Sequence, residues 1–453
     1  MLYISSVKKN YERHSMKKFL LTVVFAVALH GLLFAQDEQD SSTAVLSEQL
    51  SEVKGSVEGI NETVLEMKSV LDALKKIKIS GYIQAQFQSA EIDGANSVFQ
   101  GGIFPANTHN RFMIRRGRLK VNYDNDLTQY VLQLDATEKG VSLKDAYVSI
   151  KDPWLRTFSL TGGVFDRPFG FEISYSSSMR ESPERSRLFQ TLFPGERDLG
   201  AKIEITPQDG LFSFLNIKGG LFTGNGINPE TDNAKDFIGR LGFQFPFYEA
   251  NLSIDGGISG YFGQVRLDDT KKSYTVNSPT SFTVDSTSRY WNRNYIGADL
   301  EIYYDLPFLG GFSLRGEYIQ GENPGTQNTN LPYRAGTGDL YMRNFYGYYL
   351  SYVQNIGLSH QFILKYDVLD PNKDVVGSEI GLPANTRLSG ADVKYTTIGL
   401  GWVYHWDSNV KFVLYYDMVT NEEVAASSSV ASLSSLKADL KDNVVTFRVQ
   451  YKF

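Results

Sequence analysis

The spacing of apolar residues changes once along the chain, near residue 79, and the two spacings predict two kinds of structure. Before residue 79, apolar positions recur at alternating intervals of four and three residues. These positions are Leu46, Leu50, Val53, Val57, Ile60, Val64, Met67, Leu71 and Leu74. A sustained repeat of 3.5 residues specifies a left-handed coiled coil. We therefore predict an α-helical coiled coil over residues 44–78.

The predicted helix is expected to need partners. Gly55 and Gly59 lie outside its apolar seam and weaken an isolated helix by about 1 kcal/mol each. No segment after residue 78 has a helical period that could pair with the seam, which favours self-association. A seam of mixed Leu, Val and Ile does not strongly favour dimers, so we expect a parallel homotrimer. The alternative is one amphipathic helix that lies on its own domain.

After residue 79, apolar and polar residues alternate, which is the period of a strand with one apolar face and one wet face. The last segment shows this most clearly, because Val445, Phe447, Val449, Tyr451 and Phe453 share one face. Sixteen segments carry the pattern: Gly81–Ser89, Phe112–Tyr123, Thr128–Asp135, Leu143–Lys151, Arg156–Phe165, Leu199–Thr206, Leu211–Phe222, Asp236–Phe245, Ala250–Gln264, Arg293–Tyr304, Gly311–Ile319, Arg343–Gln354, Leu358–Asp367, Lys394–His405, Asn409–Asp417 and Asn443–Phe453.

The connections between these segments alternate between short and long. Asp124–Leu127 and Pro207–Gly210 are typical short turns, whereas Asp166–Asp198 and Val265–Asn292 are typical long loops. Ala136–Ser142 is the one brief connection in the long set. A barrel with periplasmic turns and extracellular loops places all long connections at one end. We therefore predict an all-β fold, a 16-stranded antiparallel transmembrane β-barrel over residues 79–453.

The chemistry of each face predicts which side of the wall it occupies. Arg116, Arg118 and Lys120 share one face of the second predicted strand. A charge that faces lipid at mid-membrane costs about 2–4 kcal/mol, so this basic row is predicted to line the lumen. Sixteen strands leave a channel rather than a packed core. Because a barrel has no free edge, the segment Asn443–Phe453 must close on Gly81–Ser89, with Arg448 facing inward.

The amino-acid composition excludes several classes of protein. Tyr and Phe number 27 and 29, and the 40 Gly residues suit strands and turns. A mean hydropathy of −0.26 excludes a helical membrane protein. The absence of Cys excludes disulfide scaffolds, thiol catalysis and a lipoprotein anchor. A net charge of −6 argues against nucleic acid as a partner.

The N-terminus carries a predicted targeting segment. Lys17 and Lys18 precede an apolar run, Phe19–Phe34, which is short for a membrane-spanning helix. This layout is typical of a secretory signal peptide, here residues 1–35, with cleavage before Gln36. Met16 is the better start, so residues 1–15 are interpreted as an extension.

The longest connection, Asp166–Asp198, carries the candidate selectivity residues. It contains five Arg and six acidic residues, so its net charge has no clear sign. If Arg180, Arg185 and Arg187 point into the lumen opposite the basic row, the constriction is electropositive and selects anions. The alternative is that Arg and Glu of the loop neutralise one another in a structural network.

Phe453 is the last residue of a strand with an apolar face, and this ending resembles the sorting signal of bacterial outer-membrane barrels. The resemblance implies recognition by the barrel-assembly machinery and a location in the lipid of the cell outer membrane.

Several motifs between residues 111 and 205 resemble the phosphate-selective porin O and P family. They are Arg115-Arg116-Gly117-Arg118-Leu119, Leu143-Lys144-Asp145-Ala146-Tyr147-Val148, Gly162-Gly163-Val164-Phe165-Asp166-Arg167-Pro168-Phe169-Gly170, Glu184-Arg185-Ser186-Arg187 and Glu196-Arg197-Asp198-Leu199-Gly200. The resemblance implies a trimeric, sixteen-stranded channel for small anions with a basic constriction. The sequence departs from a strongly basic lumen, since Asp145, Asp255, Asp299, Glu301, Glu317 and Asp367 also have inward positions.

Enzymatic interpretations are weak. The histidines after the signal peptide are His109, His360 and His405, and none belongs to a metal-binding motif such as HExxH. His360 lies beside Ser359 and could in principle belong to a hydrolase site. A histidine at the start of a strand is better interpreted as an ordinary residue at the membrane interface. We predict no enzyme and no cofactor. The expected function is a porin for passive diffusion of small hydrophilic solutes, with anion or phosphate preference. The alternative is a structural or adhesive barrel with a coiled-coil spacer.

Overall fold

The computed structural model describes residues 42–382 and 387–453, and within them the side chains from residue 48 onward. The signal peptide predicted over residues 1–35 and the extension 1–15 lie outside the described residues. The chain divides into two compact units, residues 1–75 and residues 76–453. Each unit is described separately below.

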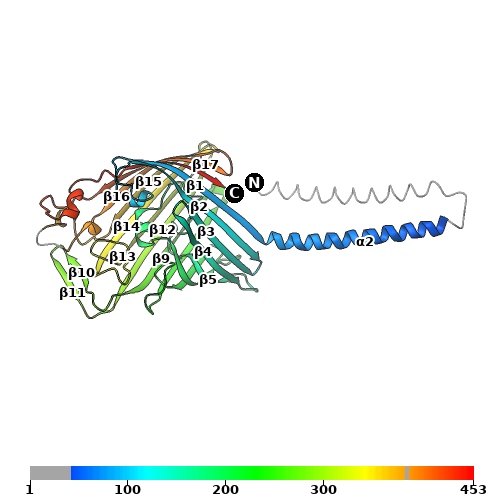
Figure 1. Cartoon of the computed structure of the whole chain (residues 1–453), viewed down its shortest axis with the longest axis horizontal. Helices are drawn as coiled ribbons and strands as arrows, with labels where there is room; N and C mark the ends of the chain where they lie inside the picture. Colours follow the sequence, from blue (N-terminus) through cyan, green and yellow to red (C-terminus); the bar gives the residue numbers. More distant parts are fainter. Residues whose placement is uncertain (1–41, 383–386) are drawn as a thin grey trace. The chain divides into compact units, whose positions relative to one another are not determined.

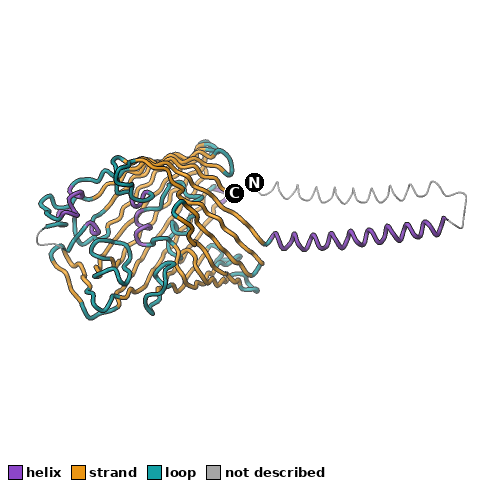
Figure 2. Tube along the Cα trace, viewed as in Figure 1, coloured by secondary structure: helices purple, strands orange, loops and turns teal. Residues whose placement is uncertain are grey.

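The described part of the first unit is helix α2 (Ser42–Lys75), which has 34 residues (Figure 2). The residues of its predicted seam from Leu50 to Leu74 are all more than half exposed. Within the described ranges, no helix is both long and apolar enough to cross a membrane.

The second unit is a closed antiparallel barrel, in which sixteen of the eighteen described strands form the wall (Figure 1). The wall strands are β1 (Ile77–Ala90), β2 (Asn110–Asn125), β3 (Thr128–Thr137), β4 (Gly140–Lys151), β5 (Phe158–Asp166), β6 (Arg197–Ile205), β7 (Leu215–Phe222), β8 (Asp236–Phe247), β9 (Leu252–Arg266), β12 (Tyr290–Leu306), β13 (Gly310–Gly325), β14 (Leu340–Ile356), β15 (His360–Asp370), β16 (Tyr395–His405), β17 (Val410–Asn421) and β18 (Val444–Lys452). The predicted sixteen-stranded antiparallel barrel is therefore confirmed, whereas the coiled coil before it stays a prediction.

Strand boundaries and loop contents differ from the prediction, most clearly at the start of β1 and in one long loop. Strand β1 begins at Ile77, inside the predicted coiled coil 44–78, because residues 77–81 pair with residues 119–123 of β2. The loop predicted over Val265–Asn292 contains a hairpin, β10 (Ser273–Ser278) and β11 (Ser281–Asp285), which extends from the wall. Strand β10 also pairs in parallel with the start of β14. Such short polar strands are stabilised by tertiary contacts rather than by their own pattern.

The barrel closes where β1 pairs with β18, as the sequence predicted. The register runs from Tyr82 opposite Lys452 to Ala90 opposite Val444. At the end of the pair, Phe453 donates its backbone N–H to the Gly81 carbonyl at 3.0 Å. A Cβ on Gly81 would meet the Arg118 carbonyl oxygen at 2.4 Å and the Phe453 ring at 2.7 Å, so this seam requires glycine.

The wall has an apolar outer face and a polar inner face. On β18, Val445, Phe447 and Tyr451 are 40–49% exposed, whereas Thr446 and Arg448 are at most 2% exposed. The other wall strands alternate in the same way, with outward residues such as Leu300, Leu364, Leu400, Trp402 and Leu414. A closed barrel with an apolar outer belt and a polar interior is the architecture of outer-membrane proteins.

The outer belt predicts that the cost of a lipid-facing charge depends on its depth in the membrane. Leu400 lies in the middle of β16 on the outer face, and Leu358 lies in a short turn between β14 and β15. Leu400→Arg should lower the free energy of unfolding by about 2–4 kcal/mol, whereas Leu358→Arg should cost at most about 1 kcal/mol. Urea titration of the protein folded into vesicles measures both. Equal costs for the two variants would contradict the outward placement of β16.

Candidate functional site: the lumen and its inward-folded loop

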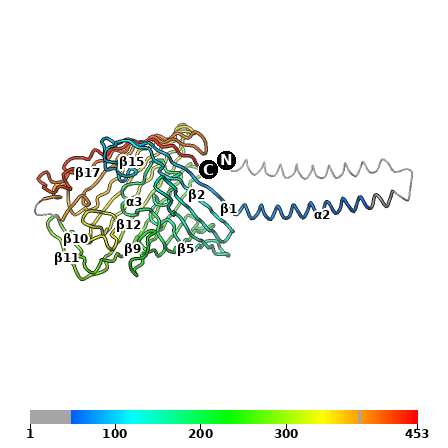
Figure 3. Tube along the Cα trace, viewed as in Figure 1, coloured from blue at the N-terminus to red at the C-terminus, as the bar shows by residue number. Residues whose placement is uncertain are grey.

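The connection between β5 and β6, residues 167–196, folds into the barrel instead of extending from it. Figure 3 shows its short helix α3 (Arg187–Leu192) within the outline of the wall. The Ser186 hydroxyl accepts a hydrogen bond from the Phe189 N–H and caps the helix. No helical period is visible in the sequence here, because a helix of six residues is too short to show one.

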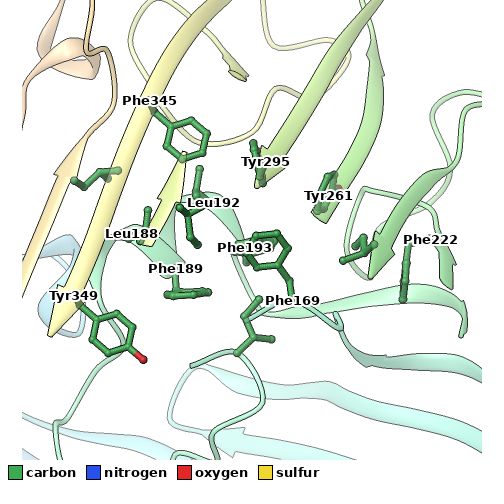
Figure 4. Close-up of a cluster of buried hydrophobic side chains, with 14 of the residues drawn as sticks. Phe169, Leu188, Phe189, Leu192, Phe193, Phe222, Tyr261, Tyr295, Phe345 and Tyr349 are labelled. Atoms are coloured by element: carbon green, nitrogen blue, oxygen red, sulfur yellow. The ribbon is translucent and has the colours of Figure 1, made fainter. Parts of the chain in front are cut away.

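One side of the loop is anchored by apolar packing against the inner wall (Figure 4). The cluster consists of Phe165, Phe169, Ile173, Leu188, Phe189, Leu192, Phe193, Phe222, Ile238, Tyr261, Tyr295, Ile319, Phe345, Tyr349 and Leu369. Phe193 packs edge-on against Tyr295 with ring centroids 5.8 Å apart. Full burial of such a side chain contributes about 1.5–3 kcal/mol, so the loop is a packed part of the interior.

The other side of the loop is anchored by one carboxylate that three guanidinium groups share. Arg115 donates to both Glu184 oxygens at 2.7 and 2.8 Å. Arg116 donates to Glu184 at 3.0 Å, and Arg448 donates to it at 3.1 Å. The first two arginines belong to β2 and the third belongs to β18, which flank the closing strand β1. We call these four residues the Glu184 clamp, and it joins the loop to both sides of the barrel seam.

Arg115 takes part in the clamp because of a β-bulge. Gln84 of β1 is opposite Arg116, but the next residue, Ala85, is opposite Ile114. The extra residue, Arg115, therefore escapes the alternation that would have turned it outward. The sequence indicated Arg116 and Arg118 as inward residues but not Arg115, since strict alternation assigns Arg115 to the lipid face.

Further ion pairs attach the loop to the wall around its edge. Glu172 accepts from Lys365 at 2.6 Å, and Glu181 accepts from Arg315 at 3.0 Å. Glu317 of β13 accepts from the loop backbone N–H groups of residues 171 and 172. Loop acids thus pair mainly with basic residues of the wall. The neutralising network exists, but it connects the loop to the barrel more than it connects the loop to itself.

The three predicted loop arginines occupy different surroundings. Arg180 is buried and donates to the carbonyls of residues 182 and 183. Arg185 pairs with Glu196 and donates to three loop carbonyls, so it stabilises the loop's own conformation. Arg187 lies against the rings of Tyr395 and Phe99, with its guanidinium carbon 3.9 and 4.6 Å from the ring centroids.

Several cavities are lined by the loop and the inner wall, and two of them border the predicted basic row. The outer cavity, on the side of the long loops, has a volume of about 540 Å³, and the inner cavity, on the side of the short turns, has about 640 Å³. Arg116 and Arg118 line the outer cavity, whereas Lys120 lines the inner one. The predicted basic row therefore extends through both levels of the lumen.

Arg197 lies at the boundary between the two cavities. Its guanidinium contacts Asp145 at 2.9 Å, Asp166 at 3.1 Å and Glu196 at 3.1 Å. Asp145 and Asp166 line the inner cavity, and Glu196 lines the outer one. The residues shared by the borders of the two cavities thus form a charged network of both signs.

Neighbouring basic residues determine the charge state of two loop acids, Glu184 and Glu196. Burial opposes ionisation of Glu184, but Arg115, Arg116 and Arg448 outweigh it and hold the pKa of Glu184 well below its usual range. Burial likewise opposes ionisation of Glu196, but Arg185, Arg197 and Lys144 hold its pKa well below the usual range. Both carboxylates therefore remain charged at any pH near neutrality.

Comparisons with known proteins agree on the fold. No family model matches the sequence, and no curated protein matches it. OprB of Pseudomonas putida superposes with a TM-score of 0.56 at 10% identity, over 85% of this chain and 96% of that chain. An anion-selective porin from Comamonas acidovorans gives 0.50 at 12% identity, over 83% of this chain and 99% of that chain. At such identities the likeness shows a shared barrel fold, and the resemblance to the O and P family stays a prediction.

The Glu184 clamp predicts acid sensitivity. A carboxylate whose pKa is lowered by folding contributes stability above its unfolded pKa, near 4.3, and that stability is lost as the pH falls towards the folded pKa. Glu184→Gln should lower the free energy of unfolding at pH 7 by about 3 kcal/mol, since it leaves buried guanidinium groups unpaired. The loss of stability between pH 5 and pH 2 should be smaller in this variant than in the unmodified protein.

Denaturant titration at each pH checks this prediction, and Glu249→Gln in an exposed turn is the matched control. An acid dependence of Glu184→Gln identical to that of the control would show that the clamp does not stabilise the barrel.

Proposed function

We propose that this chain is an outer-membrane porin for passive diffusion of small hydrophilic solutes, with a preference for anions. The fold supports a channel because the polar lumen contains cavities both on the side of the long loops and on the side of the short turns. The predicted absence of enzymatic activity is consistent with this proposal, in which the lumen acts as a selective path and not as a reaction site.

The observation that carries the anion preference is the charge of the outer cavity. Among the described residues that line it, six are basic and two are acidic. The basic residues are Arg115, Arg116, Arg118, Lys144, Arg185 and Arg187, and the acidic ones are Asp135 and Glu196. Clusters of Arg and Lys at a pore entrance favour anions and exclude cations.

The inner cavity does not share this excess. Its described lining has four basic residues, Lys120, Lys151, Arg156 and Lys202, against five acidic ones, Asp124, Asp126, Asp145, Asp166 and Glu204. The proposed selectivity therefore arises on the side of the long loops. Phosphate is one anion that such an entrance would admit, and the proposal includes phosphate as a permeant anion.

The remaining features fit the same proposal. Residues 1–35 would direct export, and Phe453 would present the end of β18 to the barrel-assembly machinery. The exposed apolar seam of α2 supports association of three copies through residues 44–75 as a periplasmic coiled coil. The rival function is an adhesive or structural barrel, in which the helix is a spacer and the extracellular loops bind a partner.

Conductance distinguishes the two functions. The purified protein in planar bilayers should conduct, and its reversal potential in a KCl gradient should indicate chloride preference. Arg116→Ala combined with Arg118→Ala should reduce the ratio of chloride to potassium permeability several-fold, because two cationic side chains leave the outer cavity. A double variant of exposed loop residues, Lys139→Ala with Lys235→Ala, is the control. A folded, inserted protein without conductance would exclude the porin.

The helix makes a separate prediction about assembly. Deletion of residues 44–75 should weaken or abolish the trimer, because it removes the seam but leaves every strand of the wall intact. Analytical ultracentrifugation in detergent measures the mass of the assembly. A deletion variant that stays fully trimeric would show that the barrel alone sets the oligomeric state.

A further inference from the structure

Arg187 differs from the other basic residues of the outer cavity in having no ionic partner. Within residues 42–382 and 387–453, no carboxylate lies within 4 Å of its guanidinium, and its Nε has no hydrogen-bond partner. The side chain is instead held by the rings of Phe99 and Tyr395. Asp367 accepts a hydrogen bond from the backbone N–H of Arg187, but it does not pair with the guanidinium. Asp442, Asp367 and Asp417 act on this guanidinium only from beyond 4 Å. Arg187 lines the outer cavity, so a solute there can approach a guanidinium that no carboxylate occupies.

Arg118 pairs with Asp135 at 3.4 Å, and the remaining basic residues of the cavity share their carboxylates with other basic residues. Lys144 is 3.9 Å from Glu196, which also pairs with Arg185 and Arg197. Arg115 and Arg116 share one carboxylate with Arg448, as described for the Glu184 clamp. A solute that neutralises this excess carries at least two negative charges.

The cavity is also large and chemically mixed. A volume of about 540 Å³ falls in the range typical of sites for organic ligands, and an inorganic anion would leave most of it filled with water. Its lining includes aromatic and apolar side chains, among them Phe99, Phe193 and Leu331. It also includes the amides of Gln190, Asn328 and Asn330. Apolar surface with a few placed polar groups suits a carbon skeleton.

We propose that the outer cavity is a binding site for multivalent organic anions, such as compact di- and tricarboxylates, and that Arg187 determines its preference for them. The proposal rests on the channel function inferred above. The aromatic rings hold the guanidinium in place without neutralising it, so its hydrogen-bond donors are available to a carboxylate. The amides and apolar groups contact the body of the solute.

Block of chloride current tests the site. Citrate, acetate and inorganic phosphate are titrated on either side of a planar bilayer that contains the full-length protein. Citrate should reach half-maximal block at a concentration at least ten-fold below that of acetate or phosphate. In Arg187→Gln, the ratio of the acetate to the citrate half-blocking concentration should fall at least five-fold. Arg187→Lys should give an intermediate ratio, because it retains the charge but not the planar stack.

Arg387→Gln is the matched control, because Arg387 also lies against an aromatic ring, Tyr274 at 4.1 Å, but does not line the outer cavity. The ratio of the acetate to the citrate half-blocking concentration in this variant should equal that of the unmodified protein. Equal block by citrate and acetate in a conducting channel would overturn the site. Equal block by citrate and phosphate would leave an inorganic anion site and overturn the organic preference. An unchanged ratio in Arg187→Gln would overturn the role of that residue.

A protein that does not conduct would contradict the porin itself. Calorimetric titration of the detergent-folded protein with citrate then tests the cavity separately. Citrate affinity that Arg187→Gln weakens at least ten-fold would support the site without the channel, and no measurable affinity would overturn both.

Discussion

The rest of the structure depends on the closure of β1 against β18. Lipid offers no hydrogen-bond partner to a backbone group, so a spanning sheet has to pair every strand within itself. Nine paired positions, from Tyr82–Lys452 to Ala90–Val444, satisfy this requirement between the first and the last strand of the wall. Closure also fixes which residues face inward, and it brings Arg116 of β2 and Arg448 of β18 to either side of one strand.

The inward-folded loop uses this geometry. Its apolar residues pack on one wall, and Glu184 binds arginines from both sides of the seam on the other. The loop lines the outer cavity, and the charged network at Arg197 includes residues of both the outer and the inner cavity. The loop carboxylates pair mainly with basic residues of the wall. A few loop arginines, Arg187 above all, therefore have no carboxylate of the loop as a partner and can contact a solute.

Much of the wall could be predicted from the sequence, since a strand that separates lipid from water must alternate apolar and polar residues. All sixteen wall strands, the closing pair and the inward direction of Arg116 and Arg118 followed from that rule. The alternation of short and long connections agrees with an antiparallel barrel, in which all long connections lie at one end. The start of β1 is the exception. Residues 77–80 already alternate between apolar and polar, but they adjoin the heptad repeat, and the predicted coiled coil extended to residue 78.

The sequence by itself determined the class of fold and the two faces of each strand, because both depend on local periodicity and on the cost of charge in lipid. Tertiary structure alone decided the site. The bulge that turns Arg115 inward depends on register with β1, and the pairing of Glu184 with Arg448 joins residues 264 positions apart. Arg180, Arg185 and Arg187 look equivalent in the sequence, yet only the folded loop decides that Arg185 binds the loop itself while Arg187 lies unpaired between rings and cavity.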